Sequence, residues 1–116
     1  FIIAYDGKEN ANKAVDFAVN SNLLKGLECH LLTVENGAAI NSSAAAERLR
    51  EAGYNVLCNK IVSDHIDEAI STYVNEEELD LLLTGAYSHS RVRSMLVGST
   101  TAKLIKSCHI PLILFR

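Results

Sequence analysis

The sequence predicts a single α/β domain built on an open, five-stranded parallel sheet that is doubly wound by helices, as in flavodoxin-like and Rossmann-like folds. Short aliphatic runs alternate with amphipathic helical patterns along the chain, which is the element order of a parallel sheet. The runs show no clean polar alternation, and this is typical of strands that are buried on both faces. A chain of 116 residues, 48% of them hydrophobic, is long enough to fill one core.

Five segments rich in Ile, Leu and Val are predicted to be the strands. They cover residues 1–5, 29–34, 56–61, 80–84 and 110–115. The last segment begins at Ile110 and ends at Phe115, and Pro111 lies near its start, where a missing N–H is tolerated. In a doubly wound topology we expect this fifth strand to lie at an edge of the sheet.

Two apolar stripes with the spacing of a helix face predict the best-defined helices. The first stripe consists of Ala11, Ala14, Val15, Ala18 and Val19, and we expect Gly26 to end that element. The second stripe consists of Ile66, Ala69, Ile70, Tyr73 and Val74. Ser63 or Asp64 can cap the second helix, and Asp67 and Glu68 suit the positive end of its dipole.

Two further helices are predicted from weaker patterns. Residues 44–52 can form a short helix that Gly53 ends, after a polar loop over residues 35–43. The last helix is expected to begin at Ser99, where Ser99, Thr100 and Thr101 offer caps, and to end near Ser107.

Composition excludes several classes of protein. The longest apolar runs are far shorter than the roughly 18 residues that a membrane span needs, so we expect no membrane partner. The three cysteines lack the spacing of a disulfide framework, which favours a reducing, cytoplasmic location. From Gly85 onward the chain has basic but no acidic residues, without the dense clusters of a nucleic-acid surface. This segment is where a small anion would bind.

Three stretches are predicted to meet at the carboxyl ends of the strands, where ligands bind in open parallel sheets. Asp6 follows the first strand, Val34 ends the second, and Gly85 follows the fourth. Gly85 allows a ligand to approach the backbone, and the stretch from Gly98 to Thr100 offers N–H donors at a helix N-terminus. Spacing alone leaves a second interpretation open, in which both glycines are turn residues and Ser99 is only a helix cap.

The stretch from Thr84 to Thr100 resembles the ATP-binding signature of the universal stress protein family. That signature is a Gly, two residues, a Gly, nine residues, then Gly and Ser or Thr; Gly85, Ser88, Gly98 and Ser99 occupy these places. The opening Ile-Ile-Ala-Tyr-Asp-Gly, the Leu-Leu-Thr-Val before Glu35 and the closing Cys-His-Ile-Pro-Leu-Ile-Leu are similar to the family's first, second and last strands. Together these blocks cover nearly the whole chain.

The resemblance implies a regulatory module of the stress response that binds ATP or AMP, alone or with Mg²⁺. Asp6 and Val34 would contact the nucleoside. The implied site comprises Ala4, Asp6, Val34, Thr84, Gly85, Tyr87, Ser88, Arg91, Gly98, Ser99 and Thr100. Ser88 departs from the signature glycine, and its Cβ could crowd the phosphates. An alternative function is therefore a nucleotide-free interaction or dimerisation domain of the same fold.

The sequence offers no catalytic constellation. Neither a Gly-x-Ser-x-Gly elbow nor a phosphate-binding Gly-x-x-x-x-Gly-Lys-Ser/Thr loop is present, so we expect no enzyme beyond slow ATP hydrolysis. The Cys29-His30 and Cys108-His109 pairs are not expected to bind a metal, because neighbouring strand residues point to opposite faces.

Self-association is the other expected partnership. The apolar strand from Ile110 to Phe115 should pair with its copy in a homodimer, or with a similar domain in tandem, as the resemblance also implies. The chain opens within a predicted strand and without an initiator Met, which suggests one half of a longer protein.

Overall fold

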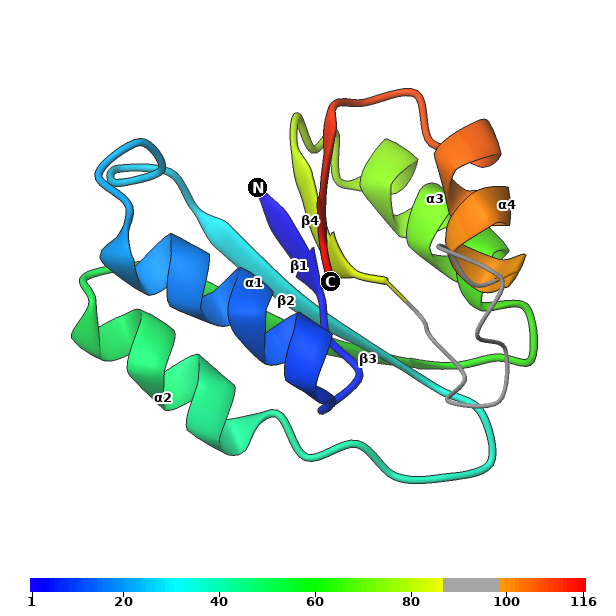
Figure 1. The fold of residues 1–116 in the computed structure, drawn as a ribbon, viewed down its shortest axis with the longest axis horizontal. Coiled ribbons are helices and arrows are strands. Elements are labelled where there is room, and N and C mark those ends of the chain that lie inside the picture. The colour runs from blue at the N-terminus through cyan, green and yellow to red at the C-terminus, as the bar shows by residue number, and fades with distance from the viewer. Residues whose placement is uncertain (87–98) are drawn as a thin grey trace.

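The computed structural model describes residues 1–86 and 99–116. Strands and helices alternate along these ranges (Figure 1). The elements are β1 (Ile2–Ala4), α1 (Glu9–Asn20), β2 (Cys29–Glu35), α2 (Ser43–Glu51), β3 (Val56–Val62), α3 (Ile66–Glu76), β4 (Leu82–Gly85), α4 (Ser99–Ser107) and β5 (Leu112–Phe115). All the predicted strands and helices are present, with ends that differ by one or two residues in most cases.

The five strands form one parallel sheet in the order β3-β2-β1-β4-β5. The predicted fold class is thus confirmed, as is the position of β5 at an edge. The strand order reverses between β1 and β4, which lie side by side in the register that pairs Ile2 with Leu82 and Ala4 with Thr84.

Two layers of helices cover the two faces of the sheet (Figure 1). On one face, α1 and α2 pack over Ile3, Leu31 and Leu83, all fully buried. On the other, α3 and α4 pack over Ile2 and Leu32. Neighbouring residues of one strand thus belong to different cores, because side chains alternate between the faces of a strand.

The expectation that every strand is buried on both faces is wrong for β3. Leu57 keeps 41% of its surface exposed and Val62 keeps 75%. β3 is the outer strand beside β2, and the helices cover it only in part. Its aliphatic residues resembled those of a central strand, although most residues of β3 are exposed.

The ends of the helices follow the predicted signals in part. Gly53, with φ of +99°, ends α2 as predicted, and hydrogen bonds from Gly53 N to Arg50 O and Tyr54 N to Leu49 O close the turn. Gly26 does not end α1, which stops at Asn20 because Ser21 is extended; Gly26 lies in the next turn.

The predicted cap of α3 is also wrong. The N-cap is His65, without a side-chain capping bond, and the hydroxyl of Ser63 instead accepts a hydrogen bond from His65 N at 3.0 Å. The Ser63 hydroxyl oxygen, which was expected to cap α3, thus stabilises a turn before the helix. Within the described ranges, none of the helices combines the length and hydropathy needed to span a bilayer.

Candidate functional site

The loops that follow β1 and β4 start next to each other at the carboxyl edge of the sheet. Tyr5 N donates to Leu32 O at 2.8 Å, and Ala86 N donates to Phe115 O at 2.7 Å. Both loops are therefore anchored to neighbouring strands where they leave the sheet. This edge is the point of strand-order reversal at which ligands bind in this fold class.

Gly85 lies against the first turn of α1. A Cβ on Gly85 would lie 2.7 Å from Ala11 N and 2.8 Å from the carbonyl carbon of Asn10, closer than real Cβ atoms approach backbone. The Asn10 side-chain amide also donates to Ala86 O at 3.2 Å. Close packing of helix on strand thus explains why this position lacks a side chain.

Asp6 begins the turn that leads from β1 into α1. Its Oδ1 accepts a hydrogen bond from Lys8 N at 2.9 Å, and Gly7 adopts a φ of +80°. Such a turn suits a short acidic side chain followed by glycine. One carboxylate oxygen therefore stabilises the turn, and Lys8 N is its only hydrogen-bond partner in the part of the chain that the structure describes.

The side chains of Ala4, Val34 and Thr84 are buried, with exposed fractions of 3%, 8% and 0%. The Thr84 hydroxyl donates to Gly85 O at 3.3 Å. These residues line up at the ends of β1, β2 and β4, so the structure brings them to one edge together with Asp6 and Gly85.

The remaining predicted site residues follow Ala86 in the chain, and only those from Ser99 onward belong to the described ranges. Tyr87, Ser88, Arg91 and Gly98 lie outside the described residues. The helix α4 begins at Ser99, as predicted, and Thr100 is its second residue.

Glu35 is a residue of this edge that the sequence analysis did not select. Its side chain is 14% exposed; Oε2 accepts from Ile40 N at 2.8 Å, and Oε1 lies 3.8 Å from Lys60 Nζ. Ile40 in turn lies beside Gly7, with its Cγ2 3.7 Å from the position of a Cβ there. The signal that could have identified Glu35 is the position of an acidic residue directly after a strand predicted to be buried.

A chain of hydrogen-bonded polar side chains lies on the α3 face of the sheet near the start of β2, with His30 and Tyr73 buried and Glu28 and Asn59 exposed. His30, 4% exposed, has Nδ1 2.7 Å from the Tyr73 hydroxyl and Nε2 2.9 Å from Glu28 Oε1. Asn59 Nδ2 donates to the same hydroxyl at 2.7 Å, so the Tyr73 hydroxyl can itself donate a hydrogen bond to His30 Nδ1. With Nε2 donating to Glu28 Oε1, both ring nitrogens of His30 have hydrogen-bond partners.

Cys29 and His30 point to opposite faces of β2, as predicted. Cys29 packs in the core beneath α1 and α2, and burial raises the pKa of its thiol from 9.0 to about 12. Among the described residues, no group of three or more His, Cys, Asp and Glu side chains is placed to hold a metal ion.

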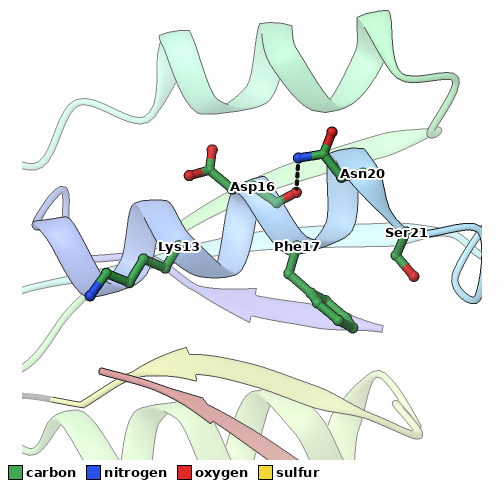
Figure 2. A pocket seen from close by; sticks show the side chains of 5 residues that line it. All are labelled: Lys13, Asp16, Phe17, Asn20 and Ser21. Carbon is green, nitrogen blue, oxygen red and sulfur yellow. Dashed lines mark hydrogen bonds between the residues drawn. The ribbon is translucent and has the colours of Figure 1, made fainter.

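A shallow depression of about 480 Å³ lies on α1, away from the predicted site residues (Figure 2). Lys13, Asp16, Phe17, Asn20 and Ser21 line it. The Asp16 carboxylate is held by Arg48 at 2.6 Å, and the Phe17 ring lies 5.5 Å from the ring of Phe115. This depression thus adjoins the edge strand β5.

The architecture defines a doubly wound α/β domain, a class in which ligands bind at the point of strand-order reversal, which here lies between the loops after β1 and β4. Residues 35–116 match the model of the universal stress protein family. The chain belongs to this family.

Similar proteins agree with this assignment. The universal stress protein Slr1230 of Synechocystis is 38% identical over 120 residues, covering 99% of this chain and 42% of the relative; the chain thus spans less than half of that protein. The universal stress protein of Archaeoglobus fulgidus shares the fold at a TM-score of 0.78 and 18% identity, covering 99% of this chain and 96% of that chain. A universal stress protein in complex with cAMP is similar at a TM-score of 0.78 and 21% identity, covering 99% and 94%.

Proposed function

We propose that this chain is a regulatory module that binds an adenine nucleotide, ATP or AMP, where the loops after β1 and β4 diverge. The observation that carries the proposal is that Asp6, directly after β1, and the loop after β4 start beside each other at the reversal point of the sheet. Membership of the universal stress protein family and the cAMP complex of a structural neighbour support it.

In this proposal the residues at the carboxyl edge of the sheet contact different parts of the nucleotide. Asp6, whose Oδ1 already accepts a hydrogen bond from Lys8 N, accepts a hydrogen bond from a ribose hydroxyl through its other carboxylate oxygen. Ala4, Val34 and Thr84 form the buried base beneath the adenine and ribose. Ser88, Gly98, Ser99 and Thr100 surround the phosphates, which Arg91, Tyr87 and, for ATP, Mg²⁺ help to bind.

The alternative function, a nucleotide-free interaction domain, is favoured by one specific observation. The lack of a side chain at Gly85 is explained by the approach of α1, so this glycine does not itself imply a ligand. Ser88 in place of the second signature glycine points in the same direction.

Nucleotide binding is tested by thermal unfolding with ATP, AMP or cAMP, each with and without Mg²⁺. A ligand that binds only the folded state at 100 times its Kd adds about 2.7 kcal/mol to the free energy of unfolding. Asp6→Asn keeps an oxygen for Lys8 N but removes the charge, so it should weaken nucleotide binding while leaving the melting temperature of the free protein nearly unchanged.

Ser88→Gly distinguishes nucleotide binding from the nucleotide-free function. The variant should bind ATP more tightly if the Cβ of Ser88 limits the approach of the phosphates. If millimolar nucleotide shifts the melting temperature of neither protein, and calorimetry detects no heat of binding, the interaction domain is the better account.

We further propose that the chain associates through β5, with a second copy or with a similar domain in the same polypeptide. Hydrogen bonds from Leu82 N to Pro111 O and Ala86 N to Phe115 O direct the odd-numbered residues of β5 towards β4. The main-chain groups of Leu112 and Leu114 therefore face outward, available to another strand.

Leu114→Pro should abolish this association without unfolding the domain, because it removes an outward N–H that β4 does not use. Leu114→Ala is the matched control, retaining the N–H. Light scattering at high micromolar concentration reports the mass of each variant. A wild-type chain that remains monomeric, with no tandem neighbour in its polypeptide, contradicts the proposal.

A further inference from the structure

The opposite edge of the sheet, along β3, is longer than β5, and no strand of the described residues pairs with its outer side. Hydrogen bonds at its two ends, from Cys29 N to Asn55 O at 2.9 Å and from Ser63 N to Glu35 O at 3.0 Å, direct its odd-numbered residues towards β2. Since main-chain groups alternate in direction along a strand, the N–H and C=O groups of the even-numbered residues face outward. These are Val56, Cys58, Lys60 and Val62, and no described residue pairs with their outward groups.

A groove of about 330 Å³ runs between β3 and α3, beside this edge. Its floor is Ile61, Ala69 and Tyr73, and its rim carries Glu68, Thr72 and Glu76. The floor is apolar and the rim is exposed. Alternate side chains of a strand added outside β3 would reach over this groove, because successive side chains of a strand point to opposite faces.

Negative charge marks both ends of the groove. Glu68 and Glu76 make no ion pair with any described residue, and the last turn of α3 has no basic side chain. Glu68 and Glu76 are eight positions apart on α3, which corresponds to about 12 Å along the helix axis. Four positions on a strand span about 13 Å, so basic residues at i and i+4 of an added strand can reach both carboxylates. The residue at i+2 then lies over the apolar floor.

A second copy of the chain does not fit this edge. Twofold pairing of two β3 strands in one continuous sheet keeps equivalent faces on the same side, so it places α3 next to the α3 of the copy. The unpaired carboxylates of Glu68 and Glu76 would then face their own equivalents. Like charges disfavour that pairing and favour a basic partner.

We propose that the β3 edge binds an extended segment of a partner protein by strand addition, and that the segment carries a basic-x-apolar-x-basic pattern facing α3. Main-chain hydrogen bonds to Val56, Cys58, Lys60 and Val62 give the affinity, as in other strand-addition complexes. The carboxylates of Glu68 and Glu76 select the partner. This edge is separate from the proposed nucleotide site and from β5.

The probe is a fluorescent peptide, acetyl-Thr-Lys-Thr-Val-Thr-Lys-Thr-amide, titrated with the intact protein and followed by anisotropy. We expect saturable binding and slower hydrogen exchange at the amides of Val56, Cys58, Lys60 and Val62. Glu68→Lys combined with Glu76→Lys should weaken binding tenfold or more, whereas Glu47→Lys on α2 should change it less than twofold. The peptide with both Lys replaced by Glu should bind at least tenfold more weakly.

A backbone variant tests the strand geometry separately. Cys58→Pro removes one outward N–H that β2 does not use, so the domain should fold and the affinity should fall at least fivefold, while Cys58→Ala keeps wild-type affinity. The proposal is overturned if the basic peptide does not bind, if the charge variants bind it normally, or if protection appears away from β3. Should Cys58→Pro fail to fold, the charge variants and the exchange pattern decide the matter.

Discussion

Gly85→Ala is expected to destabilise the domain by about 3 kcal/mol, the upper end of the usual range for overpacking a core. The added methyl would lie 2.7 to 2.9 Å from atoms of Asn10 and Ala11, two of them backbone atoms. Backbone cannot rotate away as a flexible side chain can, so α1 must shift and loosen the packing of its buried face. Urea unfolding monitored by circular dichroism measures the loss.

The matched control is Gly26→Ala, at a glycine with a positive φ of +90° and open space around it. Its cost comes from backbone conformation alone and should be about 1 to 2 kcal/mol. If Gly85→Ala were as stable as the wild type, the close contact with α1 would not be the reason for this glycine.

Raising the pH from below 9.0 towards 12 is expected to lower the free energy of unfolding by about 4 kcal/mol, because the buried thiol of Cys29 resists deprotonation. Burial raises the pKa of Cys29 from 9.0 to about 12, so the folded protein holds this proton where the unfolded chain releases it. The contribution is complete below pH 9.0 and disappears as the pH rises towards 12, at about 1.4 kcal/mol for each pH step.

The measurement compares urea unfolding of the wild type and Cys29→Ala between pH 8 and 10 in reducing buffer. The upper limit matters because burial also raises the pKa values of Tyr5, Tyr54 and Tyr73 from 10.0. The wild type should lose about 1.4 kcal/mol more than Cys29→Ala over this range. Cys58→Ala, at an exposed thiol of the neighbouring strand, is the control; equal slopes for wild type and Cys29→Ala would refute the assignment.

Periodicity predicted most of the fold because burial decides both the pattern and the structure. The stripe that includes Ala11, Ala14 and Val15 became the buried face of α1, and the aliphatic runs became the strands. Element ends were less predictable. Ser63 had the right chemistry for a cap, but its hydroxyl bonds to His65 N in a turn before α3 begins, which no local pattern distinguishes.

The sequence predicted where in the fold the candidate site lies, but not the structural reason for each of its residues. Asp6 follows β1 and Gly85 is the last residue of β4, so these neighbouring parallel strands place both residues at one edge of the sheet, as expected. That Gly85 is required by α1 depends on a contact with Asn10 and Ala11, far away in sequence. The position of Glu35 likewise depends on the path of the following loop back to Ile40.

The central position of β1 in the sheet affects how the domain folds during its synthesis. β1 pairs on one side with β2 and on the other with β4, whose residues follow much later in the chain. During synthesis, β1, α1, β2, α2 and β3 emerge while the second edge of β1 still has no strand to pair with. Closing such a distant parallel pair is slow, because the entropy of a long loop is lost before the contacts form. Addition of β4 to β1 is therefore expected to limit the folding rate, and the nascent chain is most exposed to aggregation just before that step.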